Sequence, residues 1–210
     1  CGDRRGTGVI ALGDLVRDYL LESNASHQSA QTAAAAAAVN QDRSRDGGAS
    51  RCTAPAQVPV AYMSQHALFH QVPALQTRFA VPRYTLGRLR ADTGAVNAWI
   101  GTKDTATALH RDPYLNLLAQ AAGFKYARLY AADQTHNVYA ETAVRGGNAN
   151  TFTRSAVAVE APDLVRHPRF EHALFREALL GPGDMLFMPK GMWHYVRSLT
   201  TSVSVNFWWS

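Results

Sequence analysis

The sequence predicts a mainly β protein, built as an antiparallel sandwich or barrel with a few flanking helices. After residue 55, short runs of alternating or aromatic residues follow one another, separated by Gly, Pro, Asp and Asn. These runs leave little room for the crossover helices that parallel strands require. Of the 210 residues, 47% are apolar, which suffices for one domain with a buried core.

The elements follow in chain order. Apolar residues at helical spacing predict a helix over residues 12–22, within an N-terminal region of residues 1–23. Residues 24–54 hold a polyalanine run and polar stretches with few large side chains, so we expect a disordered insert there. A domain over residues 55–210 follows, and its first strand is expected over residues 58–63.

The remaining elements of this domain are read from the same signals. A short helical turn is expected over residues 65–69, ending before a proline, and a second helix over residues 162–167. The other strands are expected over residues 95–101, 115–118, 126–130, 184–188 and 202–208.

Charge and composition exclude several classes of protein. The net charge is +5, but the basic residues are spread out, so direct nucleic-acid binding is not expected. No run approaches the roughly 18 consecutive apolar residues that span a bilayer, and the first residues lack the order of a signal peptide. We therefore expect neither secretion nor membrane insertion. Cys1 and Cys52 lie in polar or irregular sequence and suggest neither a disulfide framework nor a zinc site, which fits a reducing compartment.

His110 and Asp112 form a His-x-Asp pair, the first sign of chemistry in the sequence. In a strand, residues two apart project to the same face, so this pair would present an imidazole nitrogen beside a carboxylate oxygen. These are two of the three ligands of a 2-His-1-carboxylate triad, which binds Fe(II) and leaves positions open. A lone His-x-Asp pair is more often a structural, hydrogen-bonded pair on the surface.

The segment from Gly183 to His194 offers the third ligand. A Gly-Asp turn leads into an apolar strand, Pro and Gly mark the next turn, and His194 opens another strand. Taken alone, His194 between Trp193 and Tyr195 would be a buried core histidine. Together with the His-x-Asp pair, it is the candidate that completes the triad.

Several separated blocks resemble one known family. The pattern Gly-x5-Pro-x-Gly-x2-His of residues 183–194 resembles the second cupin motif. With the blocks at residues 61–73, 97–101 and 207–210, the chain is similar to the JmjC family of Fe(II)- and 2-oxoglutarate-dependent oxygenases. The closest likeness is to the JmjC-domain-only group described as protein arginyl hydroxylases and histone-lysine demethylases. This resemblance covers roughly residues 8–23 and 55–210.

The resemblance implies a fold and a metal site. The fold would be the double-stranded β-helix, a cupin-like jelly-roll barrel, with residues 55–210 as the JmjC catalytic domain. His110, Asp112 and His194 match the family's iron ligands and would be the catalytic and metal-binding residues.

Other matches imply contacts to the co-substrate. Tyr62, Thr107 and Lys125 match positions that bind the distal carboxylate of 2-oxoglutarate, and Asn116 matches an amide that holds the co-substrate near the iron. A dianion entering a partly dry barrel needs a cation and hydrogen-bond donors, which Lys and Thr supply. Without the family, Lys125 would be an outward strand residue, Asn116 a turn or edge amide, and Tyr62 simple core.

Gln65, Trp99 and Trp208 resemble positions near the substrate pocket. An indole can pack against an arginine or methyl-ammonium group by cation–π attraction. The two tryptophans could equally belong to the barrel core.

The activity implied by the resemblance is that of an Fe(II)- and 2-oxoglutarate-dependent dioxygenase, which uses O2 and releases succinate and CO2. Its substrate would be a protein or peptide, with a histone or another basic protein among the candidates. Hydroxylation is preferred to demethylation, because this group lacks an obvious histone-reading module. The family's compartments are the nucleus and the cytoplasm.

Two alternatives from other classes stay open. One is a catalytically inactive, cupin-like metal-binding or scaffold protein. The other is an inactive, N-terminally truncated product, suggested by a chain that begins with Cys1 rather than Met. The sequence does not choose between arginine and lysine as the target, and it does not set the oligomeric state.

Overall fold

The computed structural model describes residues 60–89, 94–141 and 153–210. Contacts within the chain separate the unit Cys1–Ala61 from the unit Tyr62–Ser210, and the second unit holds all the strands named here. The helix expected over residues 12–22 and the insert expected over residues 24–54 lie outside the described residues. Within the described residues, no helix has the length and apolar character needed to cross a bilayer.

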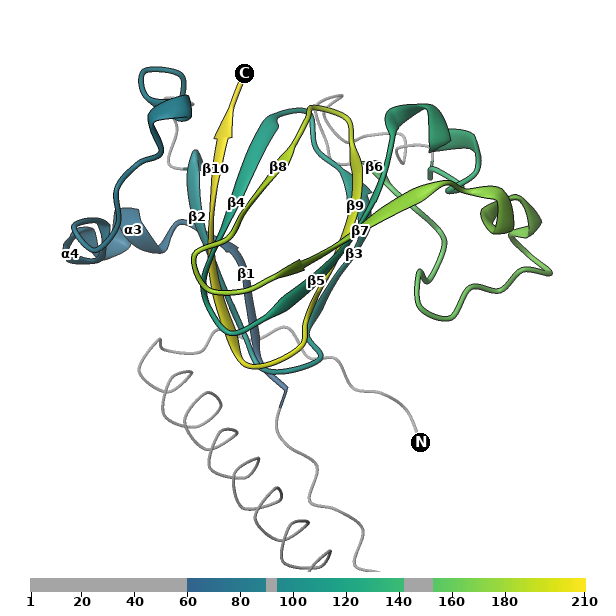
Figure 1. The fold of residues 1–210 in the computed structure, drawn as a ribbon, viewed down its shortest axis with the longest axis horizontal. Helices are drawn as coiled ribbons and strands as arrows, with labels where there is room; N and C mark the ends of the chain where they lie inside the picture. Colours follow the sequence, from purple (N-terminus) through teal and green to yellow (C-terminus); the bar gives the residue numbers. More distant parts are fainter. Residues whose placement is uncertain (1–59, 90–93, 142–152) are drawn as a thin grey trace, which may run out of the picture. The chain divides into compact units, whose positions relative to one another are not determined.

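Short strands dominate the described residues, as Figure 1 shows. The strands are β1 (Tyr62–His66), β2 (Val96–Gly101), β3 (Ala106–Arg111), β4 (Leu115–Ala122), β5 (Lys125–Tyr130), β6 (Thr153–Arg154), β7 (Phe175–Leu180), β8 (Met185–Met188), β9 (Trp193–Ser198) and β10 (Ser202–Trp209). The helices are α3 (Leu68–Gln71), α4 (Pro73–Gln76) and the 3-10 turns Arg83–Thr85, Ala132–His136 and Pro168–His172.

The strands form two antiparallel sheets of five strands each. One has the order β1-β2-β10-β4-β8 and the other β6-β3-β9-β5-β7. Strands from the two halves of the domain pair with one another: β2 with β10, β3 with β9, β4 with β8 and β5 with β7. Successive pairs lie alternately in the first and the second sheet. This interleaving is that of a jelly roll. The predicted mainly β, cupin-like jelly roll is confirmed.

Apolar side chains cover the outer faces of both sheets. On the first sheet, the rings of Phe69, Phe79 and Phe207 contact one another edge to face, with centroids 4.7 and 5.9 Å apart, and attach the α3–α4 segment to β10. On the second sheet, a buried cluster joins the strands to the segments that precede β7. Its members are Leu109, Tyr130, Val138, Val157, Val159, Phe170, Ala173, Trp193 and Tyr195. Because the outer faces carry this packing, the inner face is free to hold polar groups.

Glycine is required at Gly101, at the end of β2. A Cβ atom there would lie 2.8 Å from Cδ2 of Tyr62, on the neighbouring strand β1. Real Cβ atoms do not approach so closely, so the absence of a side chain lets the Tyr62 ring lie against β2.

Two expectations about individual elements need correction. The helix expected over residues 162–167 is a turn, followed by the 3-10 helix Pro168–His172. The carboxylate of Asp163 accepts the backbone N–H groups of Val165 and Arg166, both at 3.1 Å, and Pro168 cannot continue a helical hydrogen-bond pattern. The strand β7 was missed, because Arg176 and Glu177 interrupt its apolar pattern on an exposed edge of the sheet.

The other strand predictions are confirmed with shifted ends. β2, β5, β8 and β10 lie within a residue of their expected bounds, and β4 continues to Ala122. The first strand is Tyr62–His66, which starts later than the expected range of 58–63. The helical turn expected over 65–69 is the helix Leu68–Gln71.

Candidate functional site

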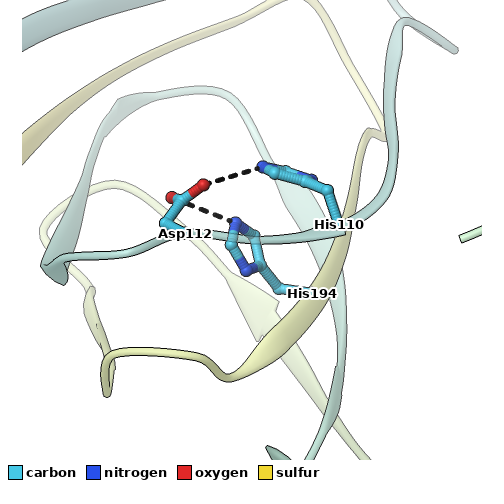
Figure 2. Close-up of side chains that lie close together, drawn as sticks. All are labelled: His110, Asp112 and His194. Carbon is cyan, nitrogen blue, oxygen red and sulfur yellow. Dashed lines mark ion pairs between the residues drawn. The ribbon is translucent and has the colours of Figure 1, made fainter. Parts of the chain in front are cut away.

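Three side chains meet on the inner face of the second sheet. His110 lies near the end of β3 and is the register partner of His194 on β9. Asp112 follows β3 directly, and its carboxylate lies 3.5 Å from Nε2 of His110 and 3.7 Å from Nε2 of His194 (Figure 2). One ligand atom from each residue lies within 4.8 Å of the others, close enough for a single metal ion. The predicted triad residues are therefore brought together.

Asp112 lies just beyond β3 and not within the strand, where the His-x-Asp pair predicts it. β3 ends at Arg111, so Asp112 is not a strand residue. Its place is held instead by the neighbouring turn, because its backbone carbonyl accepts the N–H of Gly191 at 3.0 Å. This bond ties the end of β3 to the turn that precedes β9 and His194.

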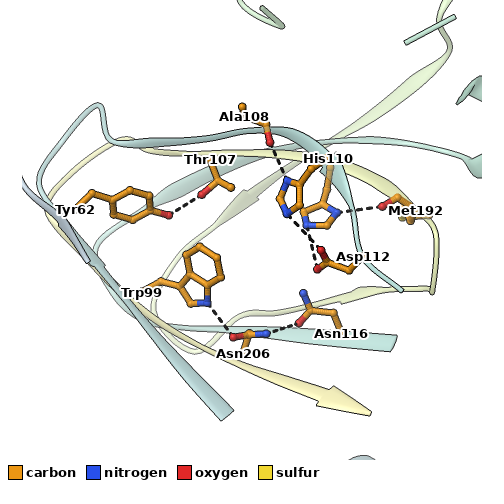
Figure 3. A network of polar contacts seen from close by, with 10 residues as sticks. Tyr62, Trp99, Thr107, Ala108, His110, Asp112, Asn116, Met192 and Asn206 are labelled. Atoms are coloured by element: carbon orange, nitrogen blue, oxygen red, sulfur yellow. Dashed lines mark hydrogen bonds and ion pairs between the residues drawn. The ribbon is translucent and has the colours of Figure 1, made fainter. Parts of the chain in front are cut away.

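Hydrogen bonds fix which nitrogen of each imidazole carries the proton. Nδ1 of His110 lies 2.8 Å from the carbonyl oxygen of Ala108 (Figure 3). Nδ1 of His194 lies 3.1 Å from the carbonyl oxygen of Met192. A carbonyl oxygen only accepts, so both Nδ1 atoms donate and both Nε2 atoms keep a lone pair. Such outer hydrogen bonds are typical of metal-ligating histidines.

Burial keeps both imidazoles neutral near pH 7. It lowers the pKa of His194 to about 4. The pKa of His110 is also lowered to about 4, by burial first and then by the proximity of His194, although the charge of Asp112 opposes this. Burial raises the pKa of Asp112, and the nearby His110 partly offsets that rise. The neutral form is the one in which histidine binds metals.

The triad fits a divalent cation because it is a group of acceptors without a donor. The two Nε2 lone pairs face the carboxylate, and Oδ1 of Asp112 is buried with no hydrogen-bond partner among residues 60–89, 94–141 and 153–210. A buried acceptor left in this state costs roughly 1–3 kcal/mol. A cation between the three side chains would satisfy all of them. Two imidazole nitrogens and one carboxylate are the ligands of non-haem Fe(II) sites.

The triad opens into a cavity between the two sheets, and part of this cavity is open to solvent. Five of the other residues singled out in the sequence line it: Tyr62, Trp99, Thr107, Asn116 and Lys125. The hydroxyl of Tyr62 lies 2.8 Å from Oγ1 of Thr107, so β1 and β3 meet across the cavity through two polar groups (Figure 3). Burial raises the pKa of Tyr62, and the bond to Thr107 partly offsets this.

Lys125 places a cation in this cavity. Its side chain is only 2% exposed, and burial lowers its pKa to about 8. In the part of the chain that the structure describes, no carboxylate pairs with its ammonium group. A buried ammonium without a counter-ion is unfavourable, and a bound anion would relieve that cost. The reading of Lys125 as an outward strand residue is therefore wrong.

Gln65 and Trp208 are not among the residues that line the cavity. Gln65 is exposed, in a bulge of β1 between Met63 and His66, with a φ of 49°. Trp208 is buried beside Tyr114, with ring centroids 5.6 Å apart. Contacts of these two residues to a substrate stay predictions.

Asn206 lines the cavity and was missed in the sequence, as were the apolar residues Leu118, Met188 and Val196. β10 carries Ser202, Ser204 and Asn206 on one face and apolar residues on the other. Polar residues at every second position of a buried strand indicate a polar interior, and this alternation would have identified Asn206.

Comparison with known proteins identifies relatives. The family model of the cupin-like domain matches residues 16–210. Lysine-specific demethylase 8 of Danio rerio is 45% identical over 152 residues, which cover 72% of this chain and 36% of that protein. JmjC domain-containing protein F of Dictyostelium discoideum is 37% identical over 174 residues, covering 74% and 37%. Lysine-specific demethylase JMJ30 of Arabidopsis thaliana is 38% identical over 152 residues, covering 71% and 33%.

The chain thus spans about a third of the length of these relatives. The family model, in contrast, matches nearly the whole chain, including all strands of both sheets and the His-Asp-His triad. The chain belongs to the cupin-like JmjC domain family.

Proposed function

We propose that the protein is an Fe(II)- and 2-oxoglutarate-dependent dioxygenase that acts on a protein side chain. The observation that carries this proposal is the pairing, in one cavity, of an acceptor-only His-Asp-His triad with a buried lysine that has no counter-ion among the described residues. A metal site alone would suit many proteins. The added cation calls for a ligand that is anionic, and 2-oxoglutarate is such a ligand.

Each residue has a proposed task. His110, Asp112 and His194 would hold Fe(II), and the three ligands would leave other coordination positions open. Lys125 would bind the distal carboxylate of 2-oxoglutarate, with the hydroxyl groups of Thr107 and Tyr62 beside it.

When bound, Fe(II) and 2-oxoglutarate supply the oxidising chemistry: O2 gives one oxygen atom to succinate, formed with CO2 from the co-substrate, and the other to a C–H bond of the substrate. The chain's own residues prepare this reaction. The two Nδ1–H···O bonds keep the histidine lone pairs directed at the metal position. Lys125 is buried in the barrel, which limits the water around its ammonium group and strengthens its attraction to an anion.

The substrate is a finer proposal. Relatives carry the name lysine-specific demethylase, which supports a methyl-lysine in a histone or another protein. Hydroxylation of an N-methyl group gives an unstable product that releases formaldehyde. Stable hydroxylation of an arginine is the alternative within the same chemistry. We place the protein in the nucleus or the cytoplasm and expect no direct binding of nucleic acid.

Succinate formation tests the enzyme proposal. The purified chain is incubated with Fe(II), 2-oxoglutarate, O2 and candidate peptides, and succinate is measured. His110→Ala should abolish turnover, whereas His136→Ala removes an exposed histidine outside the cavity and should not change it. Metal uptake without binding of 2-oxoglutarate would instead establish the scaffold alternative. Mass spectrometry of the peptide then separates the gain of one oxygen atom from the loss of a methyl group.

A further inference from the structure

Three side chains on adjacent strands of the first sheet form a chain of hydrogen bonds. Nε1 of Trp99 on β2 donates to Oδ1 of Asn206 on β10 at 2.9 Å. Nδ2 of Asn206 donates to Oδ1 of Asn116 on β4 at 3.2 Å. Asn206 is fully buried and Asn116 is 5% exposed, so water does not compete for these bonds. All three residues line the cavity.

The donor and acceptor roles in this series of hydrogen bonds are fixed by the indole of Trp99. The indole N–H of Trp99 can only donate, so the atom of Asn206 that faces it must be the oxygen. The amide nitrogen of Asn206 then faces Asn116, which must present its own oxygen in return. The opposite orientation of either amide would place two donors or two acceptors against each other.

Asn116, the last residue in this series of hydrogen bonds, lies beside the metal triad. With its oxygen engaged by Asn206, Asn116 turns its Nδ2 toward Asp112 of the metal triad, as Figure 3 shows. This nitrogen has no hydrogen-bond acceptor in the described part of the protein, and it is a donor with two hydrogens. A donor in that position attracts a carboxylate or carbonyl oxygen of a ligand, whereas the amide oxygen would repel it.

We propose that Asn206 is a positioning residue: held by the indole of Trp99, it orients the amide of Asn116 so that a donor faces the ligand beside the metal triad. Trp99 then has a task other than a wall for the substrate. The inference rests on the proposed function for the identity of the ligand, which is 2-oxoglutarate.

Asn206→Asp tests this hydrogen-bond relay, which runs from Trp99 through Asn206 to Asn116, with little change in side-chain shape. The new carboxylate still accepts from Trp99, but it cannot donate to Asn116. Asn116 should therefore turn round and donate to it, which withdraws the Nδ2 donor from the cavity. We expect the Kd of 2-oxoglutarate, measured by calorimetry in the presence of Mn(II), to rise about tenfold or more.

A double-mutant cycle separates the loss of the donor from the added negative charge. In an Asn116→Ala background there is no amide left to turn, so Asn206→Asp should then weaken binding by less than about twofold. An equal effect in both backgrounds would mean that charge alone is responsible, and it would overturn the inference.

Trp99→Phe is the second variant, which keeps an aromatic ring but removes the donor. It frees both amides to reverse, and the Kd should rise about two- to fivefold. Trp193→Phe is the matched control, because it removes one indole bond, Nε1 to Oγ1 of Thr135 at 2.9 Å, outside the cavity. A purely structural role would lower the melting temperature and the Mn(II) affinity together. The relay predicts that the affinity for Mn(II) alone is unchanged.

The wild-type measurement separates the two proposals. If the wild-type protein with Mn(II) does not bind 2-oxoglutarate, the proposed function fails and the relay loses its ligand. If the wild type binds and both Asn206→Asp and Trp99→Phe bind equally well, only the relay is overturned. Should Asn206→Asp not fold, the comparison of Trp99→Phe with Trp193→Phe decides.

Discussion

His110 and His194 face each other across the β3–β9 register, with ring centroids 4.1 Å apart. Both imidazoles direct a lone pair toward Asp112, and the pKa of each is lowered to about 4. In the absence of a metal, these three groups lower the local stability of the site, because each presents a hydrogen-bond acceptor to the others.

Asp112→Asn should separate stability from metal binding. The new amide can donate to one Nε2 atom, which removes part of the conflict among acceptors. We expect the metal-free variant to be as stable as the wild type or more stable by about 1 kcal/mol, while metal no longer raises its melting temperature. Calorimetric melting with and without Mn(II) measures both effects. Asp133→Asn, an exposed change outside the cavity, is the control, and a metal-induced rise retained by Asp112→Asn would contradict the metal site.

Lys125→Met should stabilise the free protein and abolish co-substrate binding. Methionine has a similar length and needs no counter-ion, so the penalty of the buried ammonium disappears. The lowering of the pKa to about 8 corresponds to a penalty of about 3 kcal/mol, which is the upper limit of the gain in unfolding free energy. Urea unfolding measures this gain, and calorimetry measures the loss of 2-oxoglutarate binding. The same change at Lys103, which is exposed, should do neither.

The pH dependence of stability provides an independent check on Lys125. Its pKa is about 8 in the folded protein, against the ordinary value of 10.5. Between these values the unfolded chain binds more protons than the folded one, so this lysine makes the ligand-free protein more stable as the pH rises. The difference between wild type and Lys125→Met should therefore shrink from pH 8 to pH 10.5. A constant difference would show that the ammonium is not desolvated in the folded state.

Tyr62→Phe removes the hydroxyl that meets Oγ1 of Thr107 at 2.8 Å. The loss of one partly buried hydrogen bond should cost about 1 kcal/mol of unfolding free energy. If this hydroxyl also contacts the co-substrate, the Kd of 2-oxoglutarate should rise several-fold as well. Tyr84→Phe is a suitable control, because Tyr84 is 82% exposed. Stability lost without any change in Kd would confine Tyr62 to a structural role.

The strands could be predicted where apolar and polar residues alternate, and the turns where proline or glycine occurs. β2 and β10 follow from their alternation, and the turn before β9 follows from Pro189 and Gly191. β7 was missed, because its stability comes from pairing with β5, including the contact of Arg128 with Glu177 at 3.1 Å. Such long-range pairing leaves no mark on the local sequence.

The site was predictable to the extent that single residues carry distinctive chemistry. His110, Asp112 and His194 were found from ligand type and spacing, and Lys125 from the family resemblance. Asn206 was not found, because its importance depends on neighbours from β2 and β4 that are distant in sequence.

The site is divided between the two sheets. The two histidines and Lys125 come from β9, β3 and β5 of one sheet, while Asn116, Asn206 and Trp99 come from β4, β10 and β2 of the other. A molecule held by both groups would connect the halves of the sandwich and oppose their separation. Occupancy should therefore slow amide hydrogen exchange in strands of both sheets, including residues that never touch the ligand. Binding of a ligand in the cavity would then make both sheets of the domain more rigid.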